Sequence, residues 1–451
     1  MKNLLKQNSP EKMGAFFEIL RNTIFVFLAI SSSFGFPGHV WGQELTLGRV
    51  LSLAEKNSPI LQAAVSREKE AGEFSRAADS GFFPSVGLDA VESGGFPGSA
   101  SGFGTSGLNS FPGLVASPYR KGPAAGAYAK WDLVDLSVWH QSSAAHYEFE
   151  ATRERTKLQT ELIDQQVMSV YLETIRIRGE QEAWKKLSED LTSIRDTVKR
   201  FIRNGQYSEV QGLLIEDQLA DATLREGDFA KQYQANLARL ALLTGLDPKT
   251  VSCPAPSGLS MAGLDLLAEG SKSPLIAQAE FEAKSANETA NKYSAENLPA
   301  VEIGGSAGYL SATRLEQAQD YSVFVGVSLP LFEGFRIDAQ EKAARAEAEA
   351  RQSEISGDQL AIDDLNLKFS EQIDATKEEL KILGDERERT AKAVALAKQR
   401  YLSFLGPLSD LQQALKDMVN LDLQSAEAET RLLLAAGNKF FLNGGTSEKL
   451  K

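Results

Sequence analysis

The two halves of this chain carry the same order of sequence signals, and this internal repeat limits the possible folds more than any other feature. Ser58-Pro59 and Ser273-Pro274 each open a helix-like stretch, and a second proline follows 25 residues later in both copies, at Pro84 and Pro299. A segment of alternating apolar and polar residues comes after each second proline. A repeat of this kind sets the architecture, because each copy supplies one unit of the fold.

The repeat continues at a short motif that lies after a long proline-free run in each half. Gly205–Gln211 is echoed by Gly406–Gln412, 201 residues later. Each copy therefore predicts a helix, two strands, a very long helix, a tight turn and a return helix. We expect a first repeat at 43–245, a connector at 246–260, a second repeat at 261–445 and a polar tail at 446–451.

The N-terminus has the pattern of an export signal. Four basic residues precede a short apolar core at 24–30, and small residues follow before Gln43. This order is typical of a secretory signal peptide, which we place at residues 1–42. An uncleaved anchor is the alternative, although the apolar core is short for a membrane span of about 20 residues.

Four segments alternate between apolar and small or polar residues, as strands with two different faces do. They are Ser85–Val91, Ala127–Leu133, Val301–Tyr309 and Tyr321–Leu329. Trp131, Tyr309 and Tyr321 lie near segment ends, where aromatic residues mark the membrane interfaces of transmembrane β-strands. A soluble antiparallel sheet that is buried on one face has the same period. The export signal and the repeat favour the membrane over that alternative.

Two long runs without proline predict unusually long helices. They are Ser137–Arg203 and Arg336–Ser403, and at 1.5 Å per residue each would extend roughly 100 Å. Apolar residues recur at coiled-coil spacing in blocks whose phase shifts, which suits helices packed against several neighbours. Return helices are expected at Ser208–Gly245 and Leu408–Gly444, and a first helix at Leu45–Ser80.

Composition excludes several classes of function. The net charge of −13 argues against nucleic-acid binding, which depends on basic patches. One cysteine and three histidines give no convincing metal site, and no cofactor fingerprint or catalytic motif is present. We therefore expect no enzyme, no cofactor and no metal, and a function that depends on pore width, charge and gating.

Four strands are too few to close a barrel in a membrane, because such barrels begin at about eight strands. Lipid does not tolerate unpaired strand edges, so a four-stranded sheet in a membrane requires an oligomer. A closed ring of three chains would give twelve strands, an open lumen and twelve helices below it.

The chain resembles the TolC-type outer-membrane efflux proteins over essentially all of residues 43–445. The segments that carry the resemblance are Asn57–Pro59, Gly81–Ser85, Trp131–Asp135, Asn236–Gly245 and Val327–Gly334. The resemblance implies a homotrimer in the outer membrane of a Gram-negative (diderm) bacterium. Its fold would be mainly α with membrane β: a twelve-stranded β-barrel above a periplasmic α-barrel of long helical hairpins.

The same resemblance implies the duct of a tripartite efflux or type I secretion system. Such a duct exports small molecules or polypeptides and has a periplasmic adaptor (membrane fusion) protein and an inner-membrane transporter as partners. The alternative is a periplasmic coiled-coil adaptor or scaffold that never enters the membrane. That alternative explains the helices and the export signal but not the two strand pairs.

The resemblance also places a periplasmic aperture at the two helix-turn-helix tips, whose turns contain Gly205 and Gly406. Tyr401 and Asp410 match the tyrosine and the first aspartate of the family's second tip. Phe404 replaces the familiar glycine between them, Gln413 stands where some members have a second acidic residue, and Gly406 stands where some multidrug members have arginine.

We assign the aperture to Tyr401, Asp410 and Glu209. Rings of carboxylates from three chains would attract cations and repel each other when the aperture is narrow. The alternative for both acids is a structural role at a helix N-terminus, where the helix dipole favours negative charge.

Overall fold

The structure is a computed structural model that describes residues 46–93, 122–247, 272–313 and 316–446. The expected signal peptide at 1–42 lies outside the described residues. So do most of the Gly/Ser/Pro-rich loop between the first two strands, most of the connector at 246–260 and nearly all of the tail.

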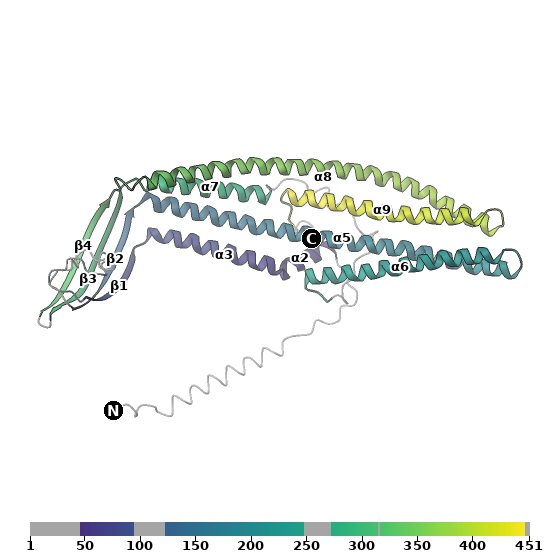
Figure 1. The fold of residues 1–451 in the computed structure, drawn as a ribbon, viewed down its shortest axis with the longest axis horizontal. Coiled ribbons are helices and arrows are strands. Elements are labelled where there is room, and N and C mark those ends of the chain that lie inside the picture. Colours follow the sequence, from purple (N-terminus) through teal and green to yellow (C-terminus); the bar gives the residue numbers. More distant parts are fainter. Residues whose placement is uncertain (1–45, 94–121, 248–271, 314–315, 447–451) are drawn as a thin grey trace, which may run out of the picture.

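The described chain is elongated, with a four-stranded sheet at one end and two helical turns at the other (Figure 1). The first half contains α3 (Pro59–Asp79), β1 (Ser85–Ser93), β2 (Gly122–Val134), α5 (Leu136–Arg203) and α6 (Glu209–Thr244). The second half contains α7 (Pro274–Ala295), β3 (Ala300–Thr313), β4 (Glu316–Ser328), α8 (Arg336–Leu402) and α9 (Leu408–Leu442). From α3 and from α7 onward the two halves thus have the same order of helices and strands, and the predicted long helices and four antiparallel strands are confirmed.

The single helix expected at Leu45–Ser80 is wrong, because the chain breaks it at Ser58. The structure has α2 (Leu47–Asn57) and then α3, followed by a 3-10 turn, η1 (Ser80–Phe82). Ser58 is extended, with φ −70° and ψ 119°, and its side chain accepts a hydrogen bond from the Leu61 amide. Proline disfavours the α conformation in the residue before it and fits the first position of a helix, so Pro59 ends one helix and begins the next.

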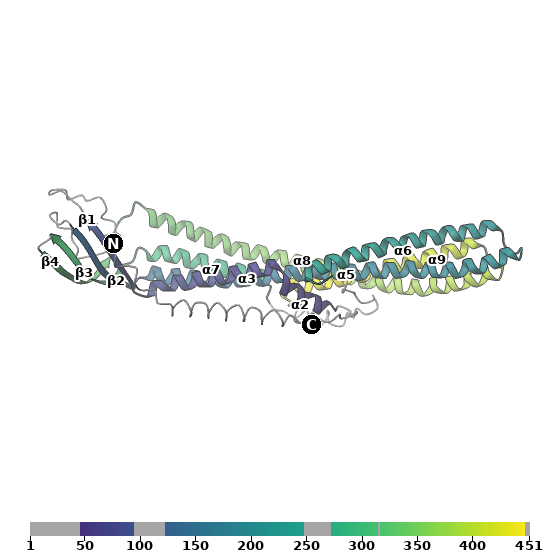
Figure 2. The ribbon, with the colours of Figure 1, turned by 90° about the horizontal axis from the view of Figure 1, so that it is seen from below.

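The helices form two sections that share α5 and α8. Next to the sheet, α5 packs against α3 and α7, and α7 packs against α8. Towards the tips, α5 packs against α6 and α9, and α9 packs against α8 (Figure 2). In both sections α8 lies at one side of the chain, while α3 and then α6 lie at the other.

Where the two sections meet, α2 folds back onto the bundle and closes a hydrophobic core. Leu51, Val167, Tyr171, Leu240 and Phe441 are almost fully buried there. A hydrogen bond of 2.6 Å from the Asn57 side chain to the Thr244 carbonyl ties the end of α2 to the end of α6. This junction holds the sheet and the tips in a fixed relation.

Within the residues that the structure describes, no helix combines the length and the apolarity needed to cross a membrane.

Candidate functional site

The sheet has one continuous apolar face, and the strand register shows how it forms. All pairs are antiparallel in the order β1-β2-β3-β4. Val86 pairs with Ala129, Ala129 with Gly305, and Gly305 with Val323, so the apolar positions of all four strands coincide. Val301 and Ile303 of this apolar sheet face are half-buried, and its other large described members are exposed: Val86, Leu88, Trp131, Leu133, Tyr321, Val323, Val325 and Val327.

The three predicted interface aromatics lie on three strands. Trp131 is 39% exposed and donates a hydrogen bond of 2.9 Å to the Phe82 carbonyl, where helices and sheet meet. Tyr321 is 83% exposed and pairs with Ala307. Tyr309 pairs with Gln319 in β4, and its side chain lies outside the described part of the structure. Their membrane-interface role stays a prediction.

The opposite, polar sheet face carries charges and two aromatic rings. Lys130 contacts Glu302 at 2.9 Å and Asp132 at 3.5 Å. The rings of Tyr128 and Phe324 lie over Gly87 and Gly304, where a Cβ atom would come within 2.5 Å of the ring. The rings therefore lie along the sheet, in space that only glycine leaves free.

Both long sides of the described chain carry an unpaired strand edge and a row of exposed apolar side chains. β1 and β4 each pair on one edge only within the described sheet. Exposed large apolar side chains follow α3 and α6 on one side and α8 on the other. They are Ile60, Val65 and Phe74; Val210, Leu213, Leu214, Leu224 and Leu242; and Leu360, Leu367, Ile382 and Leu396. Apolar side chains in such rows, beside unpaired strand edges, are typical of surfaces at which proteins associate.

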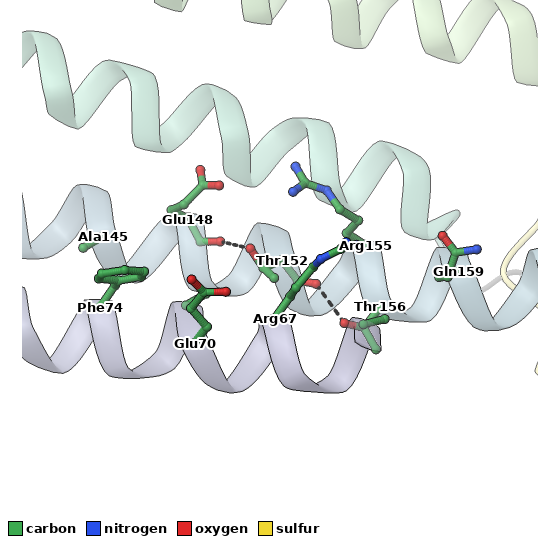
Figure 3. Close-up of a pocket in the computed structure, with 11 residues that line it drawn as sticks. Arg67, Glu70, Phe74, Ala145, Glu148, Thr152, Arg155, Thr156 and Gln159 are labelled. Carbon is green, nitrogen blue, oxygen red and sulfur yellow. Dashed lines mark hydrogen bonds between the residues drawn. The ribbon is translucent and has the colours of Figure 1, made fainter. Parts of the chain in front are cut away.

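A cavity of about 450 Å³ lies on the side of the chain that carries α3 and α6, between α3 and α5 (Figure 3). Phe74, Arg67 and Glu70 line it from α3, and Glu148 and Arg155 line it from α5. Burial raises the pKa of Glu148, while the nearby Arg155 acts in the opposite direction. The residues around the cavity form no nucleophile–base pair, so the hollow suits an interface better than a catalytic centre.

The two tip turns have the same backbone geometry but different residues at the critical position. Gly205 has φ 73° and Phe404 has φ 61°. In both turns the next amide donates to a carbonyl five residues earlier, from Gln206 to Phe201 and from Leu405 to Arg400. The turns therefore correspond at a spacing of 199 residues, not the 201 of the motif. Gly406 lies within the turn but does not take the left-handed conformation.

An aromatic cluster joins the two tips, and we define it as Phe201, Tyr207, Tyr401 and Phe404. The rings of Tyr207 and Tyr401 stack with centroids 5.1 Å apart and planes 9° apart. Phe404 contacts Phe201 at 4.9 Å and Tyr207 at 5.0 Å. The Tyr207 hydroxyl also donates a hydrogen bond to the Tyr401 carbonyl. Comparison of the two repeated motifs does not predict this cluster, because Tyr207 has no aromatic counterpart in the second motif.

The structure separates the three predicted aperture residues. Tyr401 is fully buried in the tip cluster, and burial next to Tyr207 raises its pKa to about 12. Glu209 is the first residue of α6 and Asp410 the third of α9, and both are exposed. The two acids are therefore available to solvent at the tips, whereas Tyr401 supports the wall between the hairpins.

Comparisons with known proteins agree with this geometry. A family model described as "Outer membrane efflux protein" matches residues 269–438. A search of curated proteins gave no match.

Several solved structures share the fold. VceC, an outer membrane protein of Vibrio cholerae, is 19% identical, with a TM-score of 0.71 over 88% of this chain and 96% of that chain. The CmeC outer membrane channel of Campylobacter jejuni is 14% identical, with a TM-score of 0.69 over 91% of both chains. The MtrE outer membrane channel of Neisseria gonorrhoeae is 15% identical, with a TM-score of 0.68 over 88% and 89%.

Proposed function

Because the chain belongs to the outer membrane efflux protein family, we propose that it forms one third of a homotrimeric export duct. As a member of this family it is an outer-membrane efflux channel and not an enzyme. The proposal rests on features of the two long sides of the described chain. Two open strand edges and two rows of exposed apolar side chains run along one chain. A three-fold ring satisfies all of them at once, since the β4 and α8 side of one chain meets the β1, α3 and α6 side of the next.

In this trimer each repeat contributes two strands and one helical hairpin, so residues 43–245 and 261–445 give six similar units. The apolar sheet face turns to outer-membrane lipid and the polar sheet face to the lumen of a twelve-stranded barrel. The long helices form the periplasmic α-barrel. Residues 1–42 are removed as a signal peptide, and the connector and the polar tail belong to neither repeat.

The trimer is tested by placing a charge in one apolar row. Leu213 on α6 is 64% exposed in the single chain, and Leu213→Asp buries a carboxylate in the proposed contact with α8. We expect the detergent-extracted trimer to dissociate, because an unpaired buried charge costs several kcal/mol. Thr223→Asp is the matched control, because it adds the same charge at an exposed polar position of α6 that lies about 80° around the helix from Leu213. A Leu213→Asp protein that stays trimeric in light scattering would contradict the proposed packing.

At the tips, Glu209 and Asp410 supply rings of carboxylates around the aperture, and Tyr401 holds the two hairpins behind them. In planar bilayers we expect Glu209→Ala with Asp410→Ala to widen the resting pore or to lower its preference for cations. Glu388→Ala removes an exposed acid from α8, away from the tip turns, and is the control. Unchanged conductance and selectivity in the double variant would count against this aperture.

The partners of the duct are a periplasmic adaptor and an inner-membrane transporter, which deliver small molecules or polypeptides to the tips. The exposed tips and the elongated helical section support an end-on arrangement of this kind (Figure 1). Cross-linking from a tip residue in cells, followed by identification of the captured proteins, tests it. Capture of outer-membrane proteins alone would contradict it.

A further inference from the structure

Three charged side chains meet at the end of the polar sheet face that is nearest to the helices, and we call Lys130, Asp132 and Glu302 the charged collar. Lys130 and Asp132 lie on β2, and Glu302 lies opposite Asp132 on β3. The Lys130 ammonium group reaches the Glu302 carboxylate at 2.9 Å and the Asp132 carboxylate at 3.5 Å. The ammonium thus contacts both members of a pair of facing carboxylates.

The neighbouring strands leave room for this arrangement. Gly304 stands directly opposite Lys130, and the ring of Phe324 from β4 takes the space that its missing side chain leaves. The Glu302 side chain lies over Gly326 of β4, where a Cβ atom would come within 3.2 Å of its Cγ and Oε1 atoms. Glycine at these two strand positions is unfavourable for strand stability, which points to a need for space on this face.

The collar remains accessible to water. The side chains of Lys130, Asp132 and Glu302 are 49%, 42% and 33% exposed. Ion pairs with this exposure add little to stability. Two carboxylates placed directly opposite each other on a sheet are unfavourable by themselves. The three charged side chains therefore contribute little to the stability of the fold. Exposed charges on a pore wall, in contrast, act on passing ions.

We infer that the charged collar is a second ion-selective zone of the duct, at the opposite end of the helical tunnel from the tips. The inference rests on the proposed function, because it requires the polar sheet face to line the lumen of a trimer. One lysine and two carboxylates give a net charge of −1 per chain, so three chains place −3 around one level of the lumen. Lys130 moderates the field of the six carboxylates, and the collar favours cations over anions.

The test is a series of collar charges, read as the K⁺/Cl⁻ permeability ratio from reversal potentials in a KCl gradient. Lys130→Gln changes the collar from −3 to −6, Glu302→Gln changes it to zero, and Asp132→Asn with Glu302→Gln changes it to +3. A unit charge acting through water over about 8 Å changes a local ion concentration about twofold. We expect the ratio to rise for the first variant, to fall for the second and to favour chloride for the third.

Each variant is measured both in the wild-type chain and with Glu209→Ala and Asp410→Ala, so that the tips do not mask the collar. Lys231→Gln on α6, 83% exposed, removes the same charge far from the sheet and controls for net charge. The inference is overturned if the permeability ratio stays constant across the series, or if Lys231→Gln changes the ratio as much as Lys130→Gln does. If the wild-type chain forms neither trimers nor pores, the proposed function fails instead.

Discussion

Tyr401→Phe should leave the tip as stable as before or make it more stable, although its tyrosine is the feature by which the second tip resembles its family. The Tyr401 side chain is fully buried within a single chain. Its hydroxyl oxygen has no hydrogen-bond partner among the described residues. A buried polar group without a partner costs about 1–3 kcal/mol, so removing the hydroxyl should stabilise the tip by up to about that amount.

Tyr207→Phe is the matched variant, because it removes the other hydroxyl of the stacked pair. That hydroxyl donates a hydrogen bond to the Tyr401 carbonyl, so its loss should destabilise the tip by about 1 kcal/mol. Both variants keep the ring stack, whereas Tyr401→Ala removes it and should cost about 3–5 kcal/mol.

Hydrogen exchange of the tip amides measures local stability, and single-channel recording reports how often the resting pore opens. We expect amide protection of α9 to decrease in the order Tyr401→Phe, wild type, Tyr207→Phe, Tyr401→Ala. The opening frequency of the resting pore should increase in the same order. The hydroxyl lies inside one chain, so a neighbouring chain cannot supply its partner. A Tyr401→Phe duct that opens as often as Tyr401→Ala would refute this reasoning.

Two further variants test single features. Gly205→Ala should destabilise the first tip by about 1 kcal/mol in chemical denaturation, because φ is 73° and no neighbouring atom would obstruct the new methyl group. Burial, together with the nearby Asp164, raises the pKa of Glu161 to about 8, so the folded chain retains a proton that the unfolded chain loses. Wild-type stability should therefore fall relative to Glu161→Gln as pH rises from about 4.5 to 8, by up to about 5 kcal/mol. Thermal melts at pH 5 and pH 9 should show this difference, and equal differences at both pH values would contradict it.

The sequence predicts the long elements closely, because their signals are local and repeated. α5 begins one residue before the predicted Ser137 and ends at Arg203, and α8 ends one residue before the predicted Ser403. β1 begins at Ser85, as alternation after Pro84 predicts. At Ser58 the sequence contains two opposing signals, because Ser58-Pro59 opens a helix-like stretch while the apolar stripe continues across it, and the structure follows the proline.

The tip and the collar could not be derived in the same way, because both depend on contacts between segments far apart in the chain. Tyr207 and Tyr401 are 194 residues apart, and the collar joins β2 to β3. Phe404 is the clearest example. The family resemblance implies that it replaces a glycine, but only the structure shows that it has a left-handed backbone and packs its ring on the other hairpin.

The spacing of 199 residues between the tips predicts that Glu209 and Asp410 act differently within the proposed aperture. The counterpart of Glu209 in the second hairpin is Leu408, which is 7% exposed and packs in the cluster with Val198 of α5. If the six hairpins of the trimer are similar, Glu209 points in the equivalent direction, towards α8 of the neighbouring chain. Asp410 lies two residues further into its helix, which at about 100° per residue turns it to roughly the opposite side.

The two single variants should therefore differ. Glu209→Ala removes charge at the contact between chains and should mainly change how often the aperture opens, whereas Asp410→Ala should mainly lower the K⁺/Cl⁻ permeability ratio of the open pore. Single-channel recording separates these effects, because opening frequency and reversal potential are measured independently. If both variants shift both quantities equally, the acids form one ring, and the hairpins correspond by the sequence motif and not by their backbones.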